Sequence, residues 1–196
     1  MSTGSNNLFV PPLEISLEIG HNFLGAKPSL KSTSSYRIFT PQTELSSFMT
    51  GVLGEIWAFY SSNWDLNKTN PTEWNAKNRA WYLVLEGLKN GLVYGCRERV
   101  DFGMFLGNEG ACFGFRDYGE YFKCPEIKSK WESRQFDGLA RKVQTRIRVG
   151  HVESGAGNGL EIIDKNSDLI KVDNKEGILY LVQLKKRLNG EVEVVV

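Results

Sequence analysis

Three groups of residues in this sequence have the types and the spacing that chemistry requires. Glu86 and Asn90 lie four residues apart in a stretch with helical periodicity, so their side chains share one helix face. A carboxylate there can accept a proton, and an amide oxygen can bind Mg²⁺. Asp117 and Gly119 follow a predicted strand, where the aspartate can accept a hydrogen bond from an exocyclic amine such as that of adenine.

The third group is a glycine loop, formed by Gly155, Gly157 and Gly159, directly before a predicted short helix. Such a loop offers free N–H groups and the positive end of the helix dipole, which suit a phosphate. The spacing differs from the dinucleotide fingerprint Gly-x-Gly-x-x-Gly, and a hairpin follows where that motif requires a βαβ unit. The three groups together could bind a nucleobase, a divalent cation and a phosphate.

The helix that carries the carboxylate and the amide is predicted to run from about Thr72 to Gly95. Its interior glycines, Gly87 and Gly91, each cost about 0.5–1 kcal/mol relative to alanine, and with Gly95 they form one bare stripe. Another backbone or a ligand can approach such a stripe closely. The alternative is helix–helix packing on small residues, with Glu86 and Asn90 solvated at the rim.

The remaining elements follow from hydrophobic periodicity and turn residues. A helix is predicted to open at Thr40-Pro41 with an apolar stripe from Leu45 to Tyr60, and a short one to run from Leu160 to about Asp168. Strands are predicted over 13–19, 36–39, 100–106, 111–116, 142–149, 169–173, 178–184 and 191–196. Tight turns between strands, and helices grouped in sequence, predict an α+β two-layer sandwich whose mixed, mostly antiparallel sheet is covered on one face by helices.

Composition indicates one domain with a core, because the chain has 196 residues of which 41% are hydrophobic. Residues 1–12 are predicted to be a disordered lead-in and 13–196 a single domain. The formal net charge of +1 does not favour direct nucleic-acid binding. The odd cysteine count, without a C-x-x-C pair, predicts reduced thiols, and neither a signal peptide nor an apolar run of about 20 residues is visible. We therefore expect a cytoplasmic protein without a membrane segment.

In this order, the three groups resemble the N box and the two glycine boxes of the GHKL ATPases (gyrase, Hsp90, histidine kinase and MutL type). The resemblance covers about residues 13–185, and the layout is most similar to the bacterial anti-sigma factor serine/threonine kinases. It implies the Bergerat, or histidine kinase-like ATPase, fold. It also implies a lid over about 121–154 and an added C-terminal hairpin over about 185–196.

The resemblance implies ATP and Mg²⁺ as the bound cofactors and assigns a role to each group. Asn90 would hold the Mg²⁺ that bridges the phosphates, and Glu86 would be the general base toward a protein hydroxyl or water. Asp117 would bind the adenine amine, with Gly119 at the purine. The phosphate contacts would come from the backbone of Gly155, Gly157 and Gly159.

The chain departs from the family pattern at four places. Tyr121 occupies the position where the first box usually has its second glycine. Gly91 replaces the usual alanine, and Tyr94 replaces the usual histidine. The predicted strand over 178–184 lacks the threonine with which many members contact adenine. These departures bear on turnover more than on fold.

Three functions follow from the resemblance. The first is a serine/threonine protein kinase that phosphorylates a small antagonist protein in partner switching with a sigma factor. The second, favoured by Tyr121, is a catalytically weak or inactive module that binds a nucleotide or a protein on the same fold. The third is a detached histidine kinase ATPase domain. The apolar strand over 191–196 is a candidate edge for pairing in a homodimer.

Overall fold

The computed structural model describes five stretches of the chain: residues 33–64, 71–108, 110–136, 148–153 and 158–185. Several predictions from the sequence concern residues outside these stretches and are not tested by the structure. They are the lead-in over 1–12, the strands over 13–19 and 191–196, and most of the strand over 142–149.

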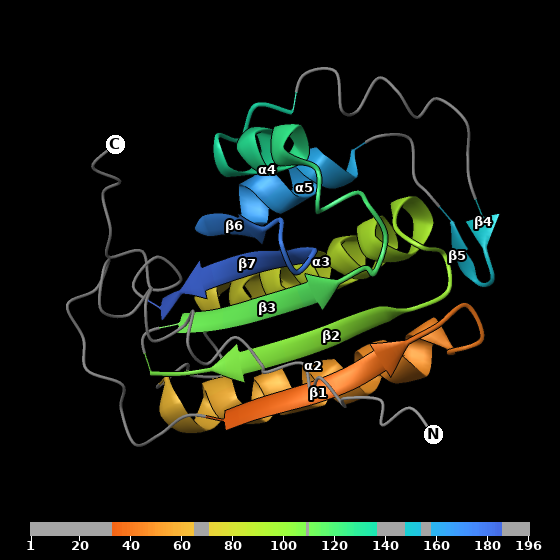
Figure 1. The fold of residues 1–196 in the computed structure, drawn as a ribbon. Helices are drawn as coiled ribbons and strands as arrows, with labels where there is room; N and C mark the ends of the chain where they lie inside the picture. The colour runs from red at the N-terminus through yellow and green to blue at the C-terminus, as the bar shows by residue number, and fades with distance from the viewer. Residues whose placement is uncertain (1–32, 65–70, 109, 137–147, 154–157, 186–196) are drawn as a thin grey trace, which may run out of the picture.

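A five-stranded antiparallel sheet lies at the centre of an α+β fold (Figure 1). Its strand order is β1–β2–β3–β7–β6, and each of the four neighbouring pairs is antiparallel. The strands are β1 (Thr33–Phe39), β2 (Val100–Leu106), β3 (Gly110–Arg116), β7 (Ile178–Leu184) and β6 (Leu169–Asp173). The predicted α+β class, with strands joined by tight turns, is confirmed, and the sheet is packed against helices.

Four helices accompany the sheet in the described part of the chain. Figure 1 shows α2 and α3 together on one face of the sheet, whereas α5 packs on α3, and α4 packs on β6. Their bounds are α2 (Leu45–Asn63), α3 (Pro71–Tyr94), α4 (Pro125–Glu132) and α5 (Gly159–Asn166). Two short strands, β4 (Arg148–Val149) and β5 (Val152–Glu153), form a separate pair.

The first helix begins later than its sequence predicts. Pro41 lies in a turn closed by the backbone N–H of Thr43, which donates to the carbonyl of Thr40 at 3.0 Å, and the threonine hydroxyls also meet at 3.1 Å. Proline is favoured at the second position of such a turn, and threonine side chains compete with helical hydrogen bonding. The helix therefore starts only at Leu45, after the extended residue Glu44.

The glycine stripe of α3 fits the helix against the sheet. A Cβ atom at Gly87 would overlap the ring of Phe115 on β3, and one at Gly91 would lie 2.9 Å from a methyl group of Val100 on β2. Real Cβ contacts are not this short, so both positions require glycine at this spacing between helix and sheet. The stripe thus serves packing, as one alternative had predicted, but its partner is the sheet.

Helix α4 is an element that the sequence pattern did not reveal. Trp131 on this helix is fully buried, and its ring lies 6.0 Å from that of Phe122 and 5.4 Å from that of Phe136. Ile127 and Trp131 are the two residues of helical apolar spacing among its eight residues, and two positions are too few to reveal a helical period. The described part of the predicted lid thus includes a helix that contributes to the core.

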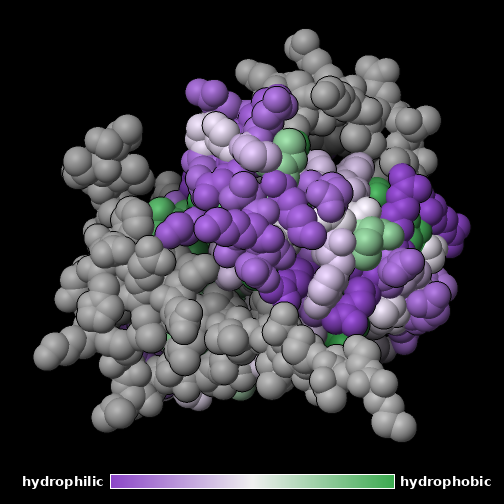
Figure 2. Space-filling view, in the orientation of Figure 1, coloured by the Kyte–Doolittle hydropathy of each residue, from purple (hydrophilic) through white to green (hydrophobic). Residues whose placement is uncertain are grey.

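Polar side chains cover most of the described surface on the viewed side, in the region of β6, β7 and α4 (Figure 2). No helix among the described residues has the length and hydrophobicity to cross a bilayer. The three cysteines, Cys96, Cys112 and Cys124, are free thiols, as the sequence predicts.

Candidate functional site

The carboxylate and the amide of the first group are buried in the middle of α3. Glu86 is 8% exposed and Asn90 is 6% exposed, so neither is solvated at a rim. The amide nitrogen of Asn90 donates to the backbone carbonyl of Glu86 at 2.7 Å, and Lys89 Nζ donates to Glu86 Oε1 at 3.0 Å. None of the described residues donates to the amide oxygen of Asn90, which leaves that oxygen suited to a cation.

The start of α5 meets this pair. A Cβ atom at Gly159, the first residue of α5, would lie 2.5 Å from Glu86 Oε2 and 4.0 Å from Asn90 Nδ2. The first N–H groups of a helix have no partner within it and carry a partial positive charge. The structure therefore brings Gly159 of the third group to Glu86 and Asn90 of the first. Gly155 and Gly157 lie outside the described residues.

Asp117 follows the end of β3 and has no solvent exposure. Its Oδ1 accepts a hydrogen bond from the backbone N–H of Gly119 at 3.0 Å, whereas Oδ2 is buried and has no hydrogen-bond partner among the described residues. Burial raises the pKa of this carboxyl group to about 6, although backbone N–H groups and Lys123 act in the opposite direction. A buried acceptor without a donor costs about 1–3 kcal/mol, so this oxygen is suited to a donor from a ligand.

Glycines bring the turn that carries Asp117 against the end of α3. A Cβ atom at Gly95 would lie 2.6 Å from Asp117 Cβ, and one at Gly119 would lie 2.8 Å from the carbonyl carbon of Gly95. The backbone N–H of Cys96 also donates a hydrogen bond to the carbonyl oxygen of Asp117, with an N···O distance of 3.4 Å. These contacts require bare backbone on both sides.

Helix α3 therefore connects the first two groups. Asp117 lies beside Gly91 and Gly95, and Glu86 lies five to nine residues earlier on the same helix. At 1.5 Å per residue this separation is about 7–14 Å along the axis. The structure therefore places the first two groups at different heights along one helix.

Two of the departures from the family pattern are neighbours in space. The rings of Tyr94, near the end of α3, and Tyr121 have centroids 5.9 Å apart, and Tyr121 also contacts Phe122 at 5.3 Å. Burial raises the pKa of Tyr121 to about 12, and the nearby Asp117 and Tyr94 act in the same direction. Tyr121 and Tyr94 therefore pack against each other beside the end of α3.

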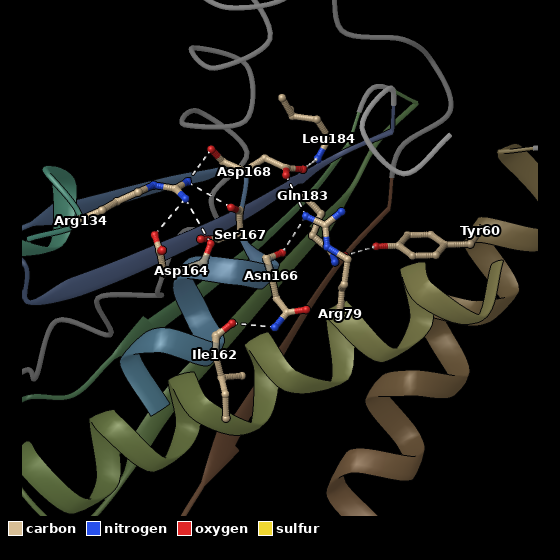
Figure 3. Close-up of polar contacts among 10 residues, drawn as sticks. All are labelled: Tyr60, Arg79, Arg134, Ile162, Asp164, Asn166, Ser167, Asp168, Gln183 and Leu184. Atoms are coloured by element: carbon tan, nitrogen blue, oxygen red, sulfur yellow. Dashed lines mark hydrogen bonds and ion pairs between the residues drawn. The ribbon is translucent and has the colours of Figure 1, made fainter. Parts of the chain in front are cut away.

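A partly buried polar network that the sequence did not indicate holds α5 in place (Figure 3). Arg79 Nη2 on α3 donates to Asp168 Oδ1 at 2.8 Å and to the carbonyl of Asn166 at 3.1 Å. Arg134 donates to the carbonyl groups of Ser167 and Asp168, at 3.0 and 2.7 Å. Cations at the end of a helix also favour its dipole.

No local signal in the sequence could have revealed this network. Its partners are 33 to 89 residues apart in the chain, so no spacing rule for a helix or a strand relates them. The network matters for the site because it fixes the helix whose first turn contacts Glu86.

The raised pKa of Asp117 predicts how stability depends on pH. Below about pH 4 the carboxyl group is protonated in both the folded and the unfolded state. Between its ordinary value of 3.8 and about 6 the folded state holds the extra proton, so the free energy of unfolding falls as pH rises. Relative to the Asp117→Asn variant, the wild type should lose about 2 kcal/mol between pH 4 and pH 7.

Urea unfolding of both proteins at several pH values measures this difference. The Asn variant is the reference because it keeps the size of the side chain and cannot ionise. A difference that stays constant across this range would contradict the burial of an ionisable Asp117.

Comparisons with known proteins were made against protein-family models and curated proteins, and neither comparison finds a match to this chain. Function is therefore inferred from the geometry of α3, the turn after β3 and the start of α5.

Proposed function

We propose that this chain is an ATP- and Mg²⁺-binding domain of the GHKL type, with the Bergerat fold, that acts as a serine/threonine protein kinase like the anti-sigma type. The observation that carries the proposal is Oδ2 of Asp117, which is buried beside the backbone of Gly95 and Gly119 and has no partner in the described part of the chain. It is the acceptor that the exocyclic amine of adenine would fill. The order of the three groups along the chain supports the same proposal.

The adenine base of the nucleotide would lie against the turn after β3. With a pKa of about 6, Asp117 is mostly ionised at neutral pH, and an ionised carboxylate accepts a stronger hydrogen bond than a neutral group. Gly119 lets the turn pack directly on the backbone of Gly95, where a Cβ atom would lie 2.8 Å from the carbonyl carbon. The carboxylate favours a ligand with a hydrogen-bond donor at its edge.

The phosphates and the cation would lie between α3 and α5. The amide oxygen of Asn90 is suited to a hard cation, and the first turn of α5 at Gly159 is suited to an anion. Mg²⁺ bound there would neutralise charge on the phosphates. Glu86 would orient the attacking hydroxyl and accept its proton, because its carboxylate lies beside Asn90 and the start of α5.

A catalytically inactive binding module is the second candidate. Lys89 Nζ lies 3.0 Å from Glu86 Oε1 and occupies one oxygen of the proposed base. Tyr121, packed against Tyr94, stands where the family pattern has a flexible glycine. This module would keep binding its protein partner when Glu86 or Asn90 is changed to alanine. A small antagonist protein or a sigma factor is the expected partner in either case.

Calorimetric titration with ATP, with and without Mg²⁺, tests the proposal. We expect micromolar binding that Mg²⁺ strengthens and that Asp117→Ala weakens by about 10- to 100-fold, because one charge-assisted hydrogen bond is lost. Asp173→Ala is a matched control, since Asp173 Oδ1 accepts the backbone N–H of Lys175 at 3.0 Å in a similar local turn. Absence of heat at millimolar ATP, from a folded protein, would exclude the nucleotide site.

A further inference from the structure

Tyr118, between the two residues of the proposed base subsite, has an unusual backbone conformation. Its φ is 56°, in the left-handed region that bulky residues rarely occupy. A tyrosine remains in such a conformation only when its surroundings hold it there. The contacts of its side chain are therefore informative.

The side chain of Tyr118 is held by Asp101 and Arg99. The Tyr118 hydroxyl donates a hydrogen bond to Asp101 Oδ2, and Asp101 is only 1% exposed. Arg99 binds the same carboxylate through both oxygens, Nε to Oδ1 at 3.0 Å and Nη2 to Oδ2 at 2.8 Å. Its guanidinium also donates to the Tyr118 hydroxyl at 3.0 Å and lies 4.6 Å from the centre of the ring.

This cluster lies on the face of the sheet opposite the helices. Phe102 on β2 contacts Phe48 of α2, so the preceding residue, Asp101, points to the other face. Asp117, in contrast, lies against Gly91 and Gly95 of α3. The turn is thus held on both faces of the sheet. Asp117 contacts α3 on one face, and Tyr118 contacts Asp101 of β2 on the other.

We infer that Tyr118 is a positioning residue: its anchorage to Asp101 and Arg99 holds the turn from Asp117 to Gly119 so that the carboxylate of Asp117 faces α3. The inference about the turn stands on the contacts alone, whereas its consequence for ATP affinity rests on the proposed function. The Tyr118 side chain is 42% exposed, so its role is not that of a core residue.

Tyr118→Phe, which removes only the hydroxyl, tests the inference. We expect the amide of Gly119, bonded to Asp117 Oδ1, to exchange with solvent at least roughly fivefold faster, as loss of one hydrogen bond predicts. The carboxyl pKa of Asp117, followed by NMR, should fall from about 6 toward its ordinary value as the turn loosens. The dissociation constant of Mg·ATP should rise by a similar factor.

Tyr36→Phe is the matched control. Burial, together with a hydrogen bond between its hydroxyl and Asp101, raises the pKa of Tyr36 to about 12, but Tyr36 belongs to β1 and not to the turn. It should leave Gly119 exchange and Asp117 titration unchanged. Equal effects of the two variants, or unchanged exchange in Tyr118→Phe, would overturn the inference. If the wild type binds no ATP, the proposed function fails, while the exchange and titration results still decide the role of Tyr118.

Discussion

Glu86→Gln should slow phosphoryl transfer by about 10²- to 10⁴-fold, the usual contribution of a general base. Glutamine keeps the size of the side chain that packs against Gly159, but it cannot take up the proton of the attacking hydroxyl. The dissociation constant of Mg·ATP should change little, because the base subsite at Asp117 is untouched. Single-turnover release of phosphate from radiolabelled ATP, measured beside calorimetric binding, separates these two effects.

Glu55→Gln is the matched control for this experiment. Glu55 lies on α2 and pairs with Arg37 on β1, at the far side of the sheet from β6. It should transfer phosphate at the wild-type rate. An unchanged rate in Glu86→Gln would remove Glu86 from the mechanism. Absence of turnover in the wild type itself, with ATP binding intact, would favour the inactive binding module.

Trp131→Ala should lower the free energy of unfolding by about 3–5 kcal/mol, the cost of removing a large buried aromatic side chain. The indole is fully buried, and its ring makes edge-to-face contacts with Phe122 and Phe136. The substitution would leave a cavity between α4 and the rest of the core. Urea unfolding, with an unchanged dependence on urea concentration, measures the loss.

Trp57→Ala provides the comparison, because it makes the same substitution on α2. Trp57 is half-buried and its ring contacts the ammonium group of Lys77 at 4.9 Å, so its removal should cost about 1 kcal/mol or less. Similar costs for the two tryptophans would mean that α4 is not part of the core. The described start of the predicted lid, which includes α4, would then move independently of the core.

Both hairpins could be predicted from the sequence almost to the residue. The predicted strands over 100–106, 169–173 and 178–184 have the observed bounds, and β3 begins one residue earlier than predicted. Alternation of side chains and tight turns are local properties, so they can be read from neighbouring residues. The long helix α3 was predicted for the same reason, to within one residue at each end.

Elements with weak local signals could not be predicted. Helix α4 has two apolar residues four apart, and it forms because Trp131 fits into the core. The turn at Pro41 depends on competition between threonine hydroxyls and the first helical turn, which the presence of a proline alone does not decide.

The sequence by itself determined which residue types are available for chemistry and on which elements they lie: Glu86 and Asn90 on one helix face, and Asp117 at a strand end. Only the tertiary structure decided that Gly159 meets Glu86, that Asp117 is buried against Gly95, and that no described residue donates to its Oδ2. The physical reason is distance along the chain. Contacts between residues tens of positions apart depend on how helices pack on the sheet, and burial, which shifts the pKa of Asp117, arises only from that packing.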